Sequence, residues 1–378
     1  MSEIVRTNPF RAVLATWPLL AVAVTLSLLG VLTIHPFDGG ASLAPRQLIW
    51  IGIGTVAYFA CAMTDMRFIR RTPVIIAGYL GTIGLLCLVL VIGTTTMGAK
   101  SWFNFGFIAF QPSDVAKLIV IALLAKYFSR RHMEIAYIHH IIVSGIYIAS
   151  IVLLVLVQPD LGTAVILSSV WFGMVLVSGI SKKHLAIVFM LGAVAASGLW
   201  FFGLHDYQRT RLLAFVNPAH DIHGSGYNAY QATVATGSGQ MWGKGIGYGT
   251  QSKLRFLPEY QTDFIFAAFA EEWGFVGVVI LLGLYALLLF QLLRISRLAA
   301  TNFDALFALG VAILITAHLA IHAGINLGLL PVTGTTIPFM SSGGSHVLME
   351  FVALGIVASL SQQGRSVPRD ASQQEYEG

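Results

Sequence analysis

The sequence predicts an all-α polytopic membrane protein with about ten transmembrane helices. Of its 378 residues, 56% are hydrophobic and only 10% are charged, whereas soluble domains carry roughly a quarter charged residues. Apolar stretches of about 20 residues, the length at which a helix crosses a bilayer, recur along the whole chain. Basic residues gather in the short segments between these stretches, as they do in the cytoplasmic loops of membrane proteins.

Ten predicted spans follow one another, mostly with short connections. In chain order they cover residues 12–34, 46–64, 73–93, 112–128, 138–157, 160–178, 184–203, 263–292, 305–328 and 345–362. The first is too long for the apolar core of a signal peptide and lacks a convincing cleavage site, so we expect it to be retained. Both cysteines fall within spans, which excludes a disulfide framework and a metal-finger spacing.

The distribution of basic residues predicts the orientation. With a cytoplasmic N-terminus, 14 of the 22 Lys and Arg residues lie inside, seven lie outside, and Lys117 falls within a span. Five of the outer seven belong to one long loop, and long loops count little in this rule. Both termini are therefore predicted to be cytoplasmic. Because topology accounts for the basic residues, their excess does not indicate a nucleic-acid partner.

The predicted organisation is one transmembrane domain, residues 1–362, followed by a polar tail, residues 363–378, that we expect to be disordered in the cytoplasm. The extracytoplasmic loop at 204–262 is far longer than any other, and such loops are usually functional or disordered. Its tyrosines, Trp242 and many glycines favour an ordered segment.

Unusual polar residues concentrate in four segments that this topology brings to the outer face. The segments are 98–117, 158–163, the long loop through Asp263, and 331–346. The cytoplasmic loops are short and merely basic. This asymmetry predicts a working site on the outer side of the membrane.

Spans four and six both begin with a Gln-Pro pair followed by an acid, Asp114 in one and Asp160 in the other. Asp160 is a candidate substrate-binding residue. A proline and an acid in the first turn are ordinary features of a helix start, so helix capping is an open alternative for Asp160. Lys117 lies three residues after Asp114, on the same helix face. We expect this pair to line a polar cavity and to help bind the substrate there, with a purely structural ion pair as the alternative.

Span eight carries three carboxylates at its head. From Asp263 onward the span is about 45 Å long, more than the hydrocarbon requires, so Asp263 is expected at the mouth of the site. Glu271 lies roughly 80° around the helix and 12 Å deeper and can border the same cavity, whereas Glu272 points elsewhere. The alternative for Asp263 is a helix N-cap, although Thr262 can take that role.

Other polar signals are weaker. His318 and His322 have an i, i+4 spacing compatible with metal ligands, but no third ligand is evident and hydrogen bonding inside the bundle is the better interpretation. The glycines of 243–249 lack the ending of a phosphate-binding loop and predict tight turns. The stretch 341–345 is interpreted as a flexible lead into span ten. Whether a divalent cation assists stays open.

The charges near this site favour an anionic substrate. Four spans direct the positive ends of their dipoles toward it. The long loop adds four cations, Arg209, Arg211, Lys253 and Arg255. A lipid carrying a phosphate or pyrophosphate fits, because its tail can stay in the bilayer. In glycosyl transfer from such a lipid, a carboxylate takes the proton of the attacking hydroxyl and cations stabilise the leaving group. The residues alone leave enzyme and transporter open.

Four motifs resemble those of the SEDS family (shape, elongation, division and sporulation). They are FLPEYQTDFIFAAFAEEWGFVG (256–277), FQPSDVAKL (110–118), QPDLGT (158–163) and IPFMSSGGS (337–345). The resemblance extends over nearly all ten spans and the long loop. Two further stretches, LHDYQRTR (204–211) and GYGTQSKLRFLPE (247–259), are more similar to the elongation member RodA than to the division member FtsW.

The resemblance implies a peptidoglycan glycosyltransferase. It would polymerise lipid II, the undecaprenyl-pyrophosphate-linked disaccharide-peptide, on the outer face of the bacterial cytoplasmic membrane. The family's essential aspartate falls on Asp263, the expected general base, and its acid–lysine pair falls on Asp114 and Lys117. The implied partner is a class B penicillin-binding protein, a transpeptidase, which we expect to contact spans eight and nine and the long loop.

Several positions depart from the family pattern. The family usually has Glu where this chain has Asp114, and often has Arg before the tryptophan that is Trp102 here. Ser342 replaces a common Tyr, and Gln261 replaces a common His. These changes leave Asp263 untouched but bear on finer substrate contacts, among which Trp102 is counted.

Two other functions compete with polymerisation. A flippase for the same lipid precursor is the main one, although transporters tend to place their sites near the midplane between repeated halves. No such halves are evident here. The other is a non-catalytic scaffold for the transpeptidase.

Overall fold

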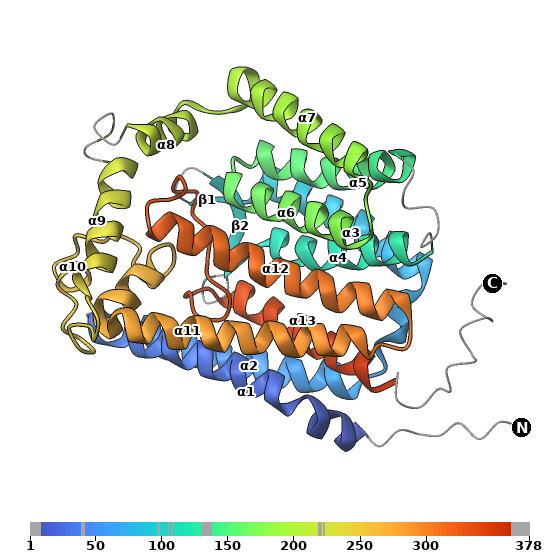
Figure 1. The fold of residues 1–378 in the computed structure, drawn as a ribbon, viewed down its shortest axis with the longest axis horizontal. Helices are drawn as coiled ribbons and strands as arrows, with labels where there is room; N and C mark the ends of the chain where they lie inside the picture. The colour runs from blue at the N-terminus through green and yellow to red at the C-terminus, as the bar shows by residue number, and fades with distance from the viewer. Residues whose placement is uncertain are drawn as a thin grey trace, which may run out of the picture.

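The computed structural model describes residues 9–38, 42–96, 99–104, 106, 109–130, 138–217, 221 and 224–363. Within them the chain is a bundle of long helices with one small antiparallel sheet of three strands (Figure 1). From residue 364 on, the predicted tail lies outside the described residues.

A helix corresponds to each of the ten predicted spans. They are α1 (Pro9–Ile34), α2 (Leu43–Met63), α3 (Thr72–Ile92), α4 (Pro112–Ser129), α5 (Ile138–Val157), α6 (Leu161–Val177), α7 (Lys182–Gly198), α11 (Ile265–Arg297), α12 (Asn302–Asn326) and α13 (Gly344–Gln363). Eight are long and apolar enough to cross a membrane. Of the other two, α6 is shorter, and α4 carries Asp114, Lys117 and Lys126.

The remaining elements connect these helices. They are the short helices η1 (His35–Phe37), η2 (Met66–Arg70), η3 (Leu199–Gly203), α8 (Asp206–Val216), α9 (Ser225–Ser238) and α10 (Thr250–Lys253), and the strands β1 (Thr94–Thr96), β2 (Ala99–Asn104) and β3 (Ala109–Phe110). The described part of the long loop is thus ordered, as predicted. The strands and α8–α10 lie at one end of the bundle, while α1 begins and α13 ends at the other (Figure 1).

Helix α12 lies at the centre of the bundle. It contacts α4, α6, α11 and α13, while α2 packs against α13 and α1. In α7, by contrast, Val188 is the one buried residue, so nearly all of this apolar helix is available to lipid.

The helix that follows Asp263 is broken, which corrects the prediction of one straight span from 263 to 292. α11 begins at Ile265, and at Gly274 its φ is 65° and its ψ −168°. A Cβ at Gly274 would lie 2.2 Å from the amide nitrogen of Gly243, so only glycine fits both the conformation and the contact. The section Phe275–Arg297 is about 35 Å long, enough to cross the bilayer alone.

A turn of the long loop, residues 239–245, fills this break. Two amides after the break donate to carbonyls of the turn, and two amides of the turn donate to carbonyls before the break. The four bonds measure 2.8–3.1 Å and run from Phe275 to Gln240, Val276 to Met241, Lys244 to Glu271 and Gly245 to Glu272. These four bonds satisfy backbone groups at the break that the helix itself does not pair. Gly243, Gly245 and Gly247 all have positive φ, as the predicted tight turns require.

The segment between α12 and α13, residues 331–343, turns back into the bundle, and we call it the re-entrant loop (Figure 1). Ile337, Phe339 and Met340 are fully buried, and the Tyr285 hydroxyl of α11 donates to the Pro338 carbonyl at 2.6 Å. Non-helical backbone at this depth is tolerated only where protein encloses it or a cavity adjoins it. The flexible lead predicted at 341–345 is wrong, because Ser341 is fully buried and hydrogen-bonded.

Candidate active site

Asp263 lies in a tight turn just before α11. The carbonyl of Glu259 accepts the amides of Thr262, Asp263 and Phe264 at 3.1–3.3 Å. The residue at the N-cap position of α11 is Phe264, and no side chain caps the helix there. The N-cap alternative for Asp263 is therefore excluded, and the carboxylate of this half-buried residue is not committed to the helix.

Two other elements hold this turn from behind. The Asn326 amide group, at the end of α12, donates to the Asp263 carbonyl at 3.1 Å and accepts the Ala267 amide at 3.1 Å. From the re-entrant loop, the Ser341 hydroxyl donates to the Thr262 carbonyl at 2.8 Å. The backbone of the turn is thus fixed while the Asp263 side chain stays accessible.

The surroundings of Asp263 disfavour its charge. Burial raises the pKa of Asp263 to about 7, and the neighbouring Glu259 carboxylate adds to this rise. The Arg211 guanidinium and a Thr262 hydrogen bond lower the pKa, and Asp160 raises it slightly. A carboxyl whose pKa lies near neutral pH can accept a proton in the reaction and release it to water.

Helix α8 brings Arg211 into this neighbourhood. Its guanidinium lies 5.6 Å from the centre of the Tyr207 ring, and the Tyr207 hydroxyl donates to the Pro159 carbonyl at 3.0 Å. The next residue, Asp160, caps α6, accepting the Thr163 amide at 3.0 Å and the Gln111 side chain at 3.0 Å. The alternative that Asp160 caps a helix is confirmed. The 158–163 segment and the long loop lie in contact, as predicted.

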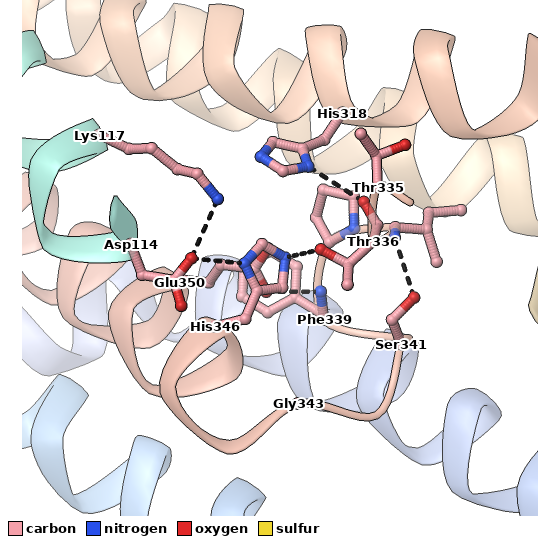
Figure 2. Close-up of polar contacts among 12 residues, drawn as sticks. Asp114, Lys117, His318, Thr335, Thr336, Phe339, Ser341, Gly343, His346 and Glu350 are labelled. Atoms are coloured by element: carbon pink, nitrogen blue, oxygen red, sulfur yellow. Dashed lines mark hydrogen bonds and ion pairs between the residues drawn. The ribbon is translucent and has the colours of Figure 1, made fainter. Parts of the chain in front are cut away.

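A buried charge cluster lies inside the bundle (Figure 2), formed by Asp114, Lys117, His346 and Glu350, and we call it the interior cluster. The Lys117 ammonium is 3.0 Å from an Asp114 oxygen, so the predicted ion pair is confirmed. His346 lies between the carboxylates, with Nδ1 3.4 Å from Asp114 and Nε2 2.8 Å from Glu350. These four residues and His318 line a cavity large enough for water.

Glu271 does not join Asp263. It is fully buried, with the Lys244 ammonium 2.7 Å from one oxygen, and it accepts the amides of Thr250 and Gln251 at 2.9–3.2 Å. The shared cavity predicted for Asp263 and Glu271 is therefore not observed. Glu272 binds the same segment through the Gly247 amide, at 2.6 Å.

Among the described residues, four other predicted binding residues make no hydrogen bond or ion pair with Asp263. The Arg209 guanidinium binds the Phe201 carbonyl at 3.2 Å, while Lys253 and Arg255 are exposed. Trp102 lies in β2, opposite Thr94. Their contacts with substrate stay predictions.

Four residues of these surroundings were not predicted from the sequence: Glu259, Asn326, His346 and Glu350. A signal existed for Glu259, because it precedes Asp263 by four residues within the same motif. No pattern in the sequence connects Asn326 or Glu350 to Asp263. Asn326 bonds the Asp263 turn directly from the end of α12, and Glu350 acts on the re-entrant loop, which has no helical periodicity. His318 and His322 hydrogen-bond carbonyls of that loop, as the hydrogen-bonding interpretation predicted. Across the described part of the chain, no group of three or more His, Cys, Asp or Glu side chains could hold a metal ion.

Comparisons with known proteins agree over nearly the whole chain. The model of the FtsW/RodA/SpoVE family, described as cell cycle proteins, matches residues 8–366. The peptidoglycan glycosyltransferase MrdB of Escherichia coli K12 is 36% identical over 313 residues, which cover 82% of this chain and 84% of MrdB. The stage V sporulation protein E of Bacillus subtilis is 34% identical over 335 residues, 88% of this chain and 90% of that protein.

Solved structures show the same architecture. One, described as structural coordination of polymerization and crosslinking by a peptidoglycan synthase complex, superposes with a TM-score of 0.79 at 31% identity and covers 93% of this chain and 98% of that one. The rod shape determining protein RodA of Thermus thermophilus gives a TM-score of 0.68 at 27% identity, over 97% of this chain and all of that one.

Proposed function

Because the chain belongs to the FtsW/RodA/SpoVE (SEDS) family and is a multi-span peptidoglycan glycosyltransferase, we propose that it polymerises lipid II with Asp263 as the general base. The observation that carries the proposal is the state of Asp263. The residue is half-buried, and its carboxylate serves no helix cap and has a pKa raised to about 7 by burial and by Glu259.

In the proposed step, the hydroxyl oxygen of the acceptor sugar forms a bond to the anomeric carbon of the donor. The bond from that carbon to the pyrophosphate oxygen breaks, and the lipid pyrophosphate leaves with the electron pair. The hydroxyl proton passes to Asp263, which releases it to water. Proton transfer of this kind contributes roughly 10²–10⁴-fold to a rate.

The cations are proposed to stabilise the leaving pyrophosphate. Arg211 is near enough to Asp263 to lower its pKa, and Lys253 and Arg255 are exposed nearby in sequence. The helix starts of α4 and α6 add positive dipole ends on the same side. An anionic leaving group would be favoured there, whereas the enclosed Lys117, already paired with Asp114, is better suited to holding helices together.

We place this site at the outer face of the bacterial cytoplasmic membrane. The support is the charge bias of the short loops and the gathering of polar segments at one end of the bundle, opposite the start of α1 (Figure 1). We also propose an elongation role, as in RodA. A division role, as in FtsW, is the alternative, and complementation of strains that lack one or the other protein distinguishes them.

A class B penicillin-binding protein is the proposed partner. A solved structure similar to this chain concerns a complex that couples polymerization and crosslinking. The lipid-facing side of α11, with Phe275 59% and Ile280 58% exposed, adjoins the long loop and offers a surface for a single-span transpeptidase. Crosslinks scanned along α11, α12 and the loop should find the partner, and crosslinks confined to the opposite end of the bundle would contradict this.

The decisive experiment uses purified protein in liposomes with labelled lipid II. Glycan strands that require Asp263 support the proposal. Movement of the precursor across the bilayer without polymer would indicate a flippase. Full function in an Asp263→Asn variant that still binds the transpeptidase would indicate a scaffold.

A further inference from the structure

The re-entrant loop is held on its inner side by histidines of α12. Nδ1 of His318 is 3.0 Å from the Thr336 carbonyl, and Nδ1 of His322 is 2.8 Å from the Thr335 carbonyl. A carbonyl only accepts, so Nδ1 carries the proton in both rings. Each ring therefore donates to the loop backbone through a fixed tautomer, and both rings are buried.

The interior cluster holds the same loop from α13. One Glu350 oxygen accepts the Phe339 amide at 2.6 Å, and the other lies 2.8 Å from Nε2 of His346. That same Nε2 is 2.7 Å from the Thr336 hydroxyl. Figure 2 shows these contacts converging on the loop from one side, with Ser341 on the other.

The groups facing His346 balance in charge. Asp114 and Lys117 face it from α4, Glu350 from its own helix, and the His318 ring from α12, with ring centres 5.1 Å apart. Both ring nitrogens of His346 lie against carboxylates, the arrangement in which a doubly protonated ring donates twice. Two anions are thereby matched with two cations, as a buried cluster requires.

The outer side of the loop holds the turn that carries Asp263. The Ser341 hydroxyl donates to the Thr262 carbonyl, and the Ser342 amide donates to the Gln261 carbonyl, both at 2.8 Å. At Gly334 the loop backbone passes so close that a Cβ would lie 3.5 Å from an Asp263 carboxylate oxygen. The loop is therefore both a support and a wall of the Asp263 environment.

We infer that Glu350 and His346 are positioning residues for the polymerisation step, acting through the re-entrant loop on the Asp263 turn. This inference rests on the proposed role of Asp263. The interior cluster fixes the backbone of Phe339 and the side chain of Thr336. The rigid loop thereby fixes the positions of Ser341 and Gly334. These two residues determine where the Asp263 carboxylate lies and how far it is shielded from water. A purely structural cluster would instead affect only the yield and thermal stability of the folded protein.

The test compares Glu350→Leu with Glu350→Gln. Glu350→Leu removes the acceptor of the Phe339 amide, and Glu350→Gln keeps an oxygen for it. We expect Glu350→Leu to lower kcat per folded molecule about 10- to 100-fold, since displacement of a catalytic group by about 1 Å can have such an effect, with KM little changed. Glu350→Gln should recover most of the rate.

The dependence of kcat/KM on pH is a second measurement, and it should not change if the interior cluster has only a structural role. In the wild type, kcat/KM should rise with pH near 7, where Asp263 ionises. In Glu350→Leu the loosened loop admits water, so this rise should move to lower pH. The matched control is Asp304→Asn, which breaks the buried pair with Arg70 (2.6 Å) at the far end of α12. It should lower stability and leave kcat and the profile unchanged.

Ser341→Ala is the second variant, because it removes the link to Thr262 and leaves every side chain of the interior cluster in place. It also removes the acceptor of the Ile337 amide within the loop. A lower kcat together with a shifted profile supports the inference even where Glu350→Leu does not fold. Wild-type kcat and profile in Ser341→Ala, or in folded Glu350→Leu, overturn it. Asp263→Asn is measured alongside, since an active Asp263→Asn protein would remove the proposed base itself, a different failure.

Discussion

The turn before α11 and the end of its first section use carboxylates in opposite ways. At one end Asp263 is partly exposed, and the described residues include no cation within ion-pair distance of it. At the other, Glu271 is fully buried, paired with Lys244 at 2.7 Å and bonded to the amides of Thr250 and Gln251. Both acids belong to one motif, so the motif alone does not separate chemistry from structure.

The two acids differ in whether the carboxylate is free to accept a proton. Glu271 has its lone pairs occupied and its charge compensated, so it stabilises the turn that fills the break at Gly274. Asp263 keeps a carboxylate in surroundings that raise its pKa to about 7. An acid left in this condition lowers stability, and such perturbed groups concentrate at functional sites.

The largest expected effect is on activity at the Asp263 end. Asp263→Asn keeps the size of the side chain but cannot accept a proton, so lipid II polymerisation should fall at least about 100-fold. Stability should be unchanged or slightly higher, because a poorly solvated charge is removed. Polymerisation in liposomes and thermal unfolding in detergent measure the two effects.

Asp263→Glu is the matched variant, since the carboxylate survives but is displaced by one methylene, and it should retain some activity. An Asp263→Asn protein that polymerised lipid II at the wild-type rate would erase the contrast between the two ends.

The next effect is on stability at the Glu271 end. Glu271→Ala leaves the Lys244 ammonium and two loop amides without their acceptor, so the free energy of unfolding should fall by about 3 kcal/mol. Proteolysis of residues 239–251 should become faster. The rate per folded molecule should fall far less than in Asp263→Asn. If activity were lost with full stability, Glu271 would belong to the site after all.

This division of roles was only partly predictable. The recurring apolar stretches predicted a helix at each of the ten spans, and the i, i+3 spacing predicted the Asp114–Lys117 pair. The catalytic role of Asp263 stays a prediction. The break at Gly274 was missed, because a glycine within a long apolar run is also compatible with an unbroken helix. What stabilises the break is the turn at 239–245, about 30 residues earlier, and such non-local hydrogen bonds leave no periodic signal in either segment.

The break itself offers a smaller test of the comparison. Gly274→Ala forces a side chain into positive φ and against the Gly243 amide, which should destabilise the protein by about 1–3 kcal/mol. Gly283→Ala, in the same helix, is the matched control, because a Cβ there meets nothing within 4 Å and alanine favours a helix by up to about 1 kcal/mol. Equal unfolding temperatures for the two variants would contradict the role given to the break.

The smallest expected effect concerns the pH dependence of Asp263 itself. Its pKa is raised first by burial and then by Glu259. Glu259→Gln removes the neighbouring negative charge, which favours ionised Asp263, so the pKa should fall and the rise of kcat/KM should move from near pH 7 to lower pH. The pKa should fall by only part of its total rise above the usual value, because burial remains.

The free energy of unfolding should also depend on pH. Asp263 binds its proton more tightly in the folded protein than in the unfolded chain, so its contribution to stability declines as pH rises from about 4 to about 7. Glu259→Gln lowers the folded-state pKa and should therefore narrow this pH range. Pre-steady-state or initial-rate polymerisation between pH 5 and 9, with Glu271→Gln as the comparison at the structural end, measures the shift. A profile that moved with Glu271→Gln and not with Glu259→Gln would mean that the group controlling the reaction lies at the buried end of the motif.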